Sequence, residues 1–234
     1  MSKVAKWDEN VKQAWDKQAE SWDSRSENMW DRGSRKDIVP FFEKYVAKGS
    51  KVIDIGCGSG YGTFKLQQAG YDAVGIDVSQ KMIELATDQF SRYPIEYFVC
   101  NIRDLSKRPD SYDAIMAINI LEWTEDPKEA INDLYTILND GGYLCAGILG
   151  PTAGPRKNSY PRLHGDDVIF NTMMPWEFEQ LAQELGFTLI DEYGVYKKGV
   201  TDEMTEKLSK ELKQALSFMW VFMMQKNEMK DDRS

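Results

Sequence analysis

Val52-Ile53-Asp54-Ile55-Gly56-Cys57-Gly58-Ser59-Gly60 is the stretch that decides the fold of this chain. A short apolar strand that carries Asp54 leads into three alternating glycines, and the pattern predicts a helix from about Tyr61. Glycine tolerates positive φ and has no Cβ, so the backbone of such a loop can touch a ligand. A glycine loop at the carboxyl end of a buried strand is typical of α/β folds that cradle a nucleotide-like molecule.

A second acid follows the next predicted strand. Residues 72–76 form that strand, and Asp77 stands seventeen positions after Gly60. A carboxylate at this place is suited to hydrogen-bonding ribose hydroxyls. The loop, the acid and their spacing together predict a site for a nucleoside-containing cofactor.

The glycine spacing excludes the commonest alternatives. The dinucleotide fingerprint needs glycine at its first, third and sixth positions, but the sixth position is Tyr61 or Thr63, depending on the starting glycine. A nicotinamide oxidoreductase is therefore the last choice, and the Lys-Ser/Thr of a phosphate-binding P-loop is missing. Asp54 would repel a pyrophosphate and attract an ammonium or sulfonium group.

By these residues, the chain resembles the class I S-adenosylmethionine-dependent methyltransferases, in particular small-molecule enzymes of the ubiquinone-biosynthesis type. The resemblance runs from about Trp15 to Lys226. It implies an α/β fold with a doubly wound, seven-stranded, mostly parallel sheet of order 3-2-1-4-5-7-6, whose last strand is antiparallel. It also implies S-adenosyl-L-methionine as the cofactor and methyl transfer as the activity.

The resemblance assigns roles to twelve residues. The loop passes under the methionine part of the cofactor, Asp54 orients its amino group and Asp77 takes both ribose hydroxyls. Arg35 is expected to reach the carboxylate. Asn101 stands where relatives carry an Asp that accepts from the adenine amino group, and its amide oxygen is expected to keep that role. The full expected set is Arg35, Asp54, Gly56, Cys57, Gly58, Gly60, Asp77, Val78, Met82, Asn101, Ile102 and Asn119.

The chain also departs from the family pattern in two places. Trp123 follows Glu122 where relatives often carry His, and the turn Leu138-Asn139-Asp140-Gly141-Gly142 lacks the usual Lys and Pro. The missing His is the only hint of a cofactor-binding protein without catalytic activity.

Apolar patterns predict the remaining elements. Strands are expected at 51–55, 72–76, 95–99, 113–118 and 142–148, with helices near 61–69, 79–90 and 127–137. Residues 187–190 and 216–225 are expected to be the last two strands, with a helix at about 202–214 between them. The apolar run at 218–224 is too short to span a bilayer, so a buried strand is expected there.

Two segments stand outside this core. Residues 1–40 are expected to form an N-terminal helical lid, because Trp-Asp pairs at 7–8, 15–16, 22–23 and 30–31 bring the Trp side chains to one helix face. These Trp staple the lid to the core, or Trp22 and Trp30 also wall the pocket. Residues 41–234 form one methyltransferase domain with a substrate-side insertion at about 150–175.

The insertion contains His164, the only histidine of the chain, and this is the first candidate for a general base. The alternative is a polar surface residue. Glu122 is a second catalytic candidate, while Tyr160 and Asp166 are weaker ones.

The composition of the chain bears on which molecules it can bind and where it is expected to function. A net charge of −9 disfavours nucleic acid, because binding to a phosphate backbone depends on positive charge. Neither a membrane span nor a secretory signal is visible, and three cysteines without metal-ligand spacing predict a cytoplasmic protein with no metal site. A small-molecule methyltransferase is the preferred prediction. A methyltransferase acting on RNA or protein, and a noncatalytic cofactor-binding regulator, are the alternatives.

Overall fold

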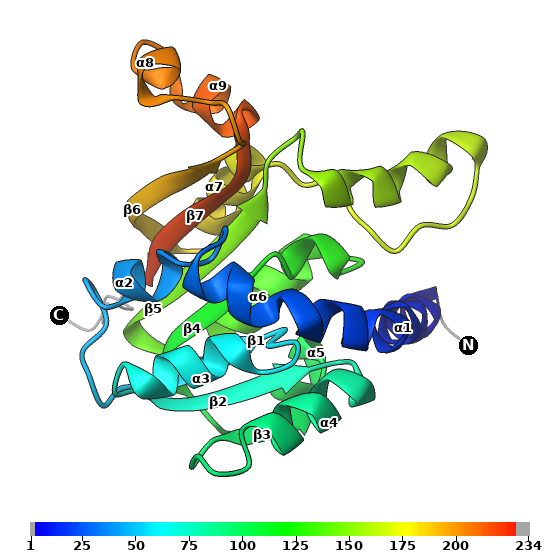
Figure 1. The fold of residues 1–234 in the computed structure, drawn as a ribbon, viewed down its shortest axis with the longest axis vertical. Helices are drawn as coiled ribbons and strands as arrows, with labels where there is room; N and C mark the ends of the chain where they lie inside the picture. The colour runs from blue at the N-terminus through cyan, green and yellow to red at the C-terminus, as the bar shows by residue number, and fades with distance from the viewer. Residues whose placement is uncertain (1–2, 228–234) are drawn as a thin grey trace, which may run out of the picture.

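A single seven-stranded sheet forms the centre of the computed structural model, which describes residues 3–227 (Figure 1). The strands lie in the order β3-β2-β1-β4-β5-β7-β6. The β1 to β5 pairings are parallel, whereas β7 is antiparallel to both β5 and β6. This topology confirms the predicted fold. The strands are β1 (Lys51–Ile55), β2 (Asp72–Asp77), β3 (Glu96–Val99), β4 (Tyr112–Ile118), β5 (Leu138–Leu149), β6 (Phe187–Tyr196) and β7 (Ser217–Lys226).

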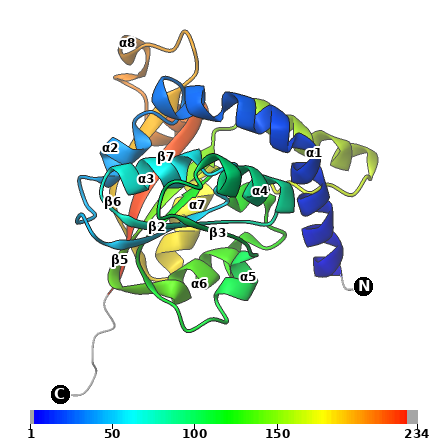
Figure 2. The same ribbon diagram turned by 60° about the horizontal axis from the view of Figure 1, so that its bottom comes forward.

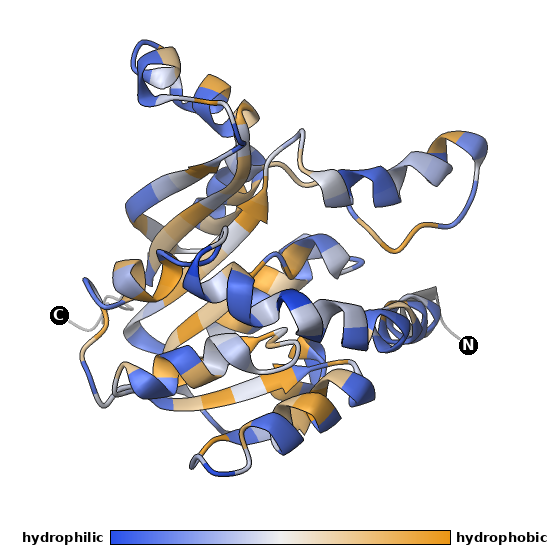
Figure 3. Cartoon of the chain, in the orientation of Figure 1, coloured by the Kyte–Doolittle hydropathy of each residue, from blue (hydrophilic) through white to orange (hydrophobic). Residues whose placement is uncertain are grey.

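Side chains of the central strands alternate between two apolar cores, one on each face of the sheet. In β1, Val52 packs with one core while Ile53 and Ile55 pack with the other. Successive strand residues point to opposite faces, so a strand covered on both sides is apolar nearly throughout. Figure 3 shows this hydrophobic character along the strands.

Helices cover both faces. Phe42 of α2 and Leu66 of α3 pack in the core that contains Val52, while Leu134 of α6 and Phe178 of α7 pack in the core that contains Ile53. The helices are α1 (Lys3–Asp31), α2 (Ile38–Phe42), α3 (Tyr61–Gln68), α4 (Gln80–Gln89), α5 (Ile102–Leu105), α6 (Pro127–Ile137), α7 (Pro175–Glu184), α8 (Asp202–Thr205) and α9 (Lys210–Ala215), with 3-10 helices η1 (Leu121–Trp123) and η2 (Gly154–His164).

The helix expected at 202–214 is two short helices. Helix α8 ends at Thr205, and Ser209 starts α9 by accepting a hydrogen bond from the Leu212 amide at 3.4 Å. Because the serine side chain accepts from a free amide of the first turn, a second helix can begin in the middle of the segment. The expected buried strand is β7, whose residues 219–224 are all buried.

Helix α1 is the expected N-terminal helix, and Figures 1 and 2 show it running across the molecule before the chain enters the sheet. It packs against α3 and α4. It contains 29 residues, yet neither α1 nor any other helix of residues 3–227 is both long and apolar enough to cross a membrane. The outermost residues of the two expected segments, 1–2 and 228–234, lie outside the described residues.

Residues 150–174 leave the sheet after β5 and project from it (Figure 1), which fits the expected insertion. The segment contains η2 and is closed at its neck by the buried Arg156. The guanidinium donates to the carbonyls of Leu149, Gly150 and Met173, the last at 2.8 Å. Arg156 thus joins both ends of the segment.

Candidate functional site

The glycine loop between β1 and α3 has the backbone shape that its sequence predicts. Gly56, Gly58 and Gly60 have φ values of 69°, 56° and 83°. A Cβ at Gly56 would lie 2.8 Å from the Ile120 side chain, and one at Gly58 would lie 2.7 Å from the Trp22 indole. Only glycine satisfies both the conformation and the close approach.

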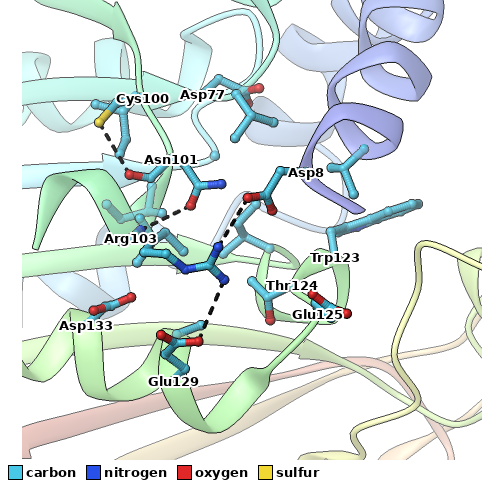
Figure 4. Close-up of a pocket in the computed structure, with 18 of the residues that line it drawn as sticks. Asp8, Asp77, Cys100, Asn101, Arg103, Trp123, Thr124, Glu125, Glu129 and Asp133 are labelled. Atoms are coloured by element: carbon cyan, nitrogen blue, oxygen red, sulfur yellow. Dashed lines mark hydrogen bonds and ion pairs between the residues drawn. The ribbon is translucent and has the colours of Figure 1, made fainter. Parts of the chain in front are cut away.

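A cleft lies beside this loop at the carboxyl ends of the strands. It consists of two adjoining cavities, which share Val11, Gly56, Asp77, Val78, Ile120 and Trp123 as walls. The smaller cavity, here the tryptophan-lined end, is also bounded by Trp15, Trp22, Arg35, Met82 and Asn119. The larger one, here the acid-lined end, is bounded by Asp8, Asn101, Ile102, Arg103, Glu129 and Ala130 (Figure 4).

Asp77 lies where the two ends meet. Its carboxylate accepts from the backbone amide of Gly58 at 3.0 Å and from that of Ser79 at 2.8 Å. Burial raises the pKa of Asp77 to about 6, although these amides act in the opposite direction. The strand end and the glycine loop are therefore linked through the acid that the sequence singled out.

Asp54 lies beneath the loop. Its carboxylate accepts from the Thr63 hydroxyl at 2.8 Å, and its side chain is buried. Burial raises the pKa of Asp54 to about 7, while the Thr63 hydrogen bond and the charge of Arg35 oppose this rise.

Arg35 is a buried cation on the wall of the tryptophan-lined end. It is 8% exposed, and its guanidinium carbon lies 4.9 Å from the ring centroid of Trp22 and 5.5 Å from that of Trp30. Burial lowers its pKa to about 10. Within residues 3–227 its guanidinium makes no hydrogen bond or ion pair, although Asp54 is close enough to raise its pKa. A buried cation without a hydrogen-bonded partner is costly, so this arrangement suits an anionic ligand group.

Asn119 is the second group without a partner. It is the only non-glycine residue with positive φ among the described residues, at 57°, and it directly follows β4 at the tryptophan-lined end. Its buried Oδ1 accepts no hydrogen bond. Strain of this kind is concentrated at functional sites, and a free acceptor beside a cleft suits a donor on a ligand.

Asn101 caps a short helix at the edge of the cleft. Its Oδ1 accepts from the Arg103 amide at 3.1 Å and thereby caps α5. The amide oxygen thus already accepts one hydrogen bond, and its expected contact with an adenine amino group stays a prediction. The side-chain nitrogen is a donor left for the cleft.

Helix α1 covers the cleft. Trp22 lies against Gly58, and Asp16 accepts from the Ser79 hydroxyl at 2.6 Å and from the Lys81 amide at 3.2 Å. Toward the N-terminus, the Trp7 indole donates to the Trp123 carbonyl at 2.8 Å. Trp22 therefore walls the cleft as one of the two sequence interpretations proposed, while Trp30 packs on Gly62 behind the loop.

The sequence analysis did not predict Asp8, Val11 or Asp16 as cleft residues or as contacts of the lid. The Trp-Asp repeat contained the signal, because three of its aspartates contact the core: Asp8 through Arg103, Asp16 through Ser79, and Asp31 through Lys65 at 2.9 Å. The periodicity of the repeat predicts a contact with the core only for the Trp of each pair.

Nine of the twelve expected cofactor residues line the cleft: Arg35, Gly56, Gly58, Asp77, Val78, Met82, Asn101, Ile102 and Asn119. Asp54 lies below them. Cys57 and Gly60 are buried in the loop behind the wall, where the Cys57 amide donates to Ile76 and a Cβ at Gly60 would meet Ala86 and Tyr97.

The two catalytic candidates do not line the cleft. Glu122 is fully buried, and its carboxylate accepts from the Leu149 amide at 2.6 Å, which joins η1 to the end of β5. Burial raises the pKa of Glu122. His164 is exposed on η2, with its ring 5.4 Å from that of Tyr160. A role in proton transfer stays a prediction for both residues.

Comparison with known proteins agrees with this geometry. Residues 53–146 match the family described as "Methyltransferase domain". The chain is 28% identical over 136 residues to the ubiquinone biosynthesis O-methyltransferase of Chromobacterium violaceum, covering 53% of this chain and 59% of that enzyme. It is 26% identical over 184 residues to the enzyme of the same name from Coxiella burnetii, covering 71% and 77%.

Among solved structures, a methyltransferase in complex with the Haloferax volcanii Trm112 methyltransferase activator superposes with a TM-score of 0.72. The superposition covers 95% of this chain and 100% of that one at 15% identity, so it speaks for the fold alone. The family match thus identifies residues 53–146 as part of a class I S-adenosylmethionine-dependent methyltransferase domain, and the superposition shows the fold around it. The chain is distantly similar to the ubiquinone biosynthesis O-methyltransferases.

Proposed function

We propose that the cleft binds S-adenosylmethionine with its amino-acid part at the tryptophan-lined end and its adenine at the acid-lined end, and that the acceptor is a small molecule. The observation that carries the proposal is Arg35, a buried guanidinium without a hydrogen-bond partner on the cleft wall. Together with Asp54, it offers one positive and one negative group, which complements the carboxylate and the ammonium of an amino acid.

The other walls fit the rest of the cofactor. Asp77 offers a carboxylate at the junction of the two ends, where ribose hydroxyls would be held. Beyond it, Ile102, Ile120 and Ala130 offer an apolar slot for a flat base. The backbone of Gly56 and Gly58 has no Cβ to block close approach.

When bound, S-adenosylmethionine supplies a methyl group already activated by the sulfonium. The residues of the chain then have to orient the reactants and exclude water. Trp15, Trp22 and Trp123 wall the tryptophan-lined end, so an acceptor there would be shielded by aromatic side chains. This enclosure and the acidic net charge favour a small molecule over RNA. The relatives named O-methyltransferases make an oxygen acceptor the first class to test.

The test of cofactor placement uses three ligands in calorimetric titration. S-adenosylhomocysteine carries the aminocarboxylate, methylthioadenosine has the same nucleoside without it, and NADH is the control. We expect Arg35→Met to weaken S-adenosylhomocysteine about tenfold or more, because a hydrogen bond between charged groups contributes roughly 1.5–3 kcal/mol. Methylthioadenosine should bind equally well to both proteins.

The exposed Arg32 provides the matched control, so Arg32→Met should bind all ligands like the wild type. Equal weakening of S-adenosylhomocysteine and methylthioadenosine by Arg35→Met would contradict the placement of the carboxylate. Release of S-adenosylhomocysteine in the presence of small hydroxyl-bearing acceptors then tests turnover. Turnover only with RNA or protein, or binding without any turnover, would favour the two alternative functions.

A further inference from the structure

Asn101 is a weaker acceptor for an adenine than a carboxylate would be. Its single, uncharged side-chain oxygen already caps α5 by accepting from the Arg103 amide, whereas an aspartate would keep a second, charged oxygen for the exocyclic amino group. Asn101 also offers an NH₂ donor, so a charged acceptor for the amino group has to come from a neighbouring residue.

Asp8 of α1 supplies a carboxylate on the same wall. Its Oδ2 lies 3.4 Å from Nη1 of Arg103, whose Nη2 lies 3.7 Å from Glu129. Asp8 and Asn101 thus both contact Arg103, one through its guanidinium and the other through its backbone amide, and both line the acid-lined end (Figure 4). The Asp8 side chain keeps 36% of its surface exposed, so oxygen lone pairs are available to a ligand.

We propose that Asp8 and Asn101 together recognise adenine by hydrogen bonds. The Asp8 carboxylate accepts from the exocyclic amino group of adenine, and the Asn101 nitrogen donates to the ring nitrogen beside it. This acceptor-donor pair is complementary to the donor-acceptor edge of adenine. The inference rests on the proposed function, since it places adenine at the acid-lined end. It also makes base recognition depend on α1, because Asp8 reaches the cleft only when that helix is docked.

The test compares S-adenosylhomocysteine with S-inosylhomocysteine, in which an oxygen replaces the amino group and the neighbouring ring nitrogen carries a hydrogen. In the wild type, the Asp8 carboxylate would face this oxygen and the Asn101 NH₂ group would face the ring N–H, so we expect at least about tenfold weaker binding of the inosyl ligand. The Asp8→Asn side chain can accept or donate at the position of the exocyclic group. It should therefore weaken the adenosyl ligand, strengthen the inosyl ligand and reduce the preference about threefold or more.

Two further variants distinguish the recognition of adenine by Asp8 from a structural disturbance of α1 or of the cleft. Glu9→Gln removes a neighbouring charge of α1 that bonds Gln13 outside the cleft, and it should keep the wild-type preference. Asn101→Asp keeps an oxygen for the α5 cap but removes the donor to the ring nitrogen, so it should weaken the adenosyl ligand and favour the inosyl ligand, whose ring nitrogen carries a hydrogen.

The outcomes are distinct. A wild type that binds both ligands equally, or an Asp8→Asn variant that keeps the full preference, overturns the inference while S-adenosylhomocysteine still binds. A wild type that does not bind S-adenosylhomocysteine overturns the proposed function and the inference with it.

Discussion

Two buried charges dominate the site at the scale of single residues. Asp54 and Arg35 influence each other's pKa, yet burial is the larger effect on both. A charged ligand is therefore expected to change the protonation of both side chains. For Asp54 this change can be measured near neutral pH, because burial raises its pKa to about 7.

The affinity for S-adenosylhomocysteine should rise between pH 6 and pH 8. At pH 6 most Asp54 carboxyls are protonated, and at pH 8 most are ionised. A ligand ammonium favours the ionised form, so binding at the lower pH must release a proton and should be about tenfold weaker. Calorimetry in buffers of different ionisation enthalpy measures both the affinity and the proton release.

Asp54→Asn is the control for this prediction. It should bind more weakly at pH 8 and lose most of the pH dependence, because no carboxyl then titrates beneath the loop. An unchanged pH profile would assign the titration to another group, with Asp77 the first candidate since its pKa is raised to about 6.

The residues whose place beside the cleft could be predicted from the sequence are those fixed by the fold. Gly56 and Asp77 stand at strand ends, and parallel strands bring their carboxyl ends to one edge. The direction of the Asn101 amide depends on a helix cap, and the arrival of Asp8 depends on how α1 docks. Neither follows from spacing along the chain.

At the scale of elements, α1 is attached by the aspartates of its Trp-Asp pairs. The Trp side chains turn toward the core, and Asp16 and Asp31 reach α4 and α3 from the adjacent positions. Asp16 bonds the first turn of α4, where free amides and the helix dipole favour a carboxylate.

Asp16→Ala should loosen α1 without unfolding the sheet. The loss of hydrogen bonds from a charged acceptor costs roughly 1.5–3 kcal/mol, so amide hydrogen exchange in the middle of α1 should be about ten- to a hundredfold faster. Asp23→Ala is the matched control, because Asp23 makes no hydrogen bond or ion pair to the core within residues 3–227. Similar exchange in both variants would contradict an attachment through Asp16.

The regular elements were predictable for a physical reason. Strands β1, β2 and β4 agree closely with the expected ranges because burial on both faces leaves a continuous apolar run. The segment 150–174 has no such run. It is closed by hydrogen bonds from Arg156 to carbonyls at both of its ends, and no local sequence pattern predicts these contacts.

At the scale of the whole molecule, β7 joins the edge strand β6 to the rest of the sheet. It lies between β5 and β6, and both of its faces are covered. Phe222 is at its centre, fully buried, with its ring 5.1 Å from that of Phe178 in α7.

Phe222→Ala should lower the free energy of unfolding by about 3–5 kcal/mol, since it removes a buried ring and leaves a cavity. Urea denaturation measures the change. Tyr160→Ala, on the exposed η2, should stay within about 0.5 kcal/mol of the wild type. A loss below about 1 kcal/mol for Phe222→Ala would show that β7 is not a central part of the packed core.

The hydrogen bonds by which Arg156 joins both ends of segment 150–174 affect how this protein can change over evolutionary time. A segment whose two ends are pinned together can be exchanged as a module, because its length no longer affects the sheet below. The entropic penalty of a longer loop grows only with the logarithm of its length. Asn171 donates to the carbonyls of Leu121 and Thr124, and Phe170 packs on Trp123, so the end of the segment supports the cleft wall. Descendants that keep this end, the arginine and its carbonyl partners can therefore graft shorter or longer segments between positions 157 and 166 and so acquire new surfaces.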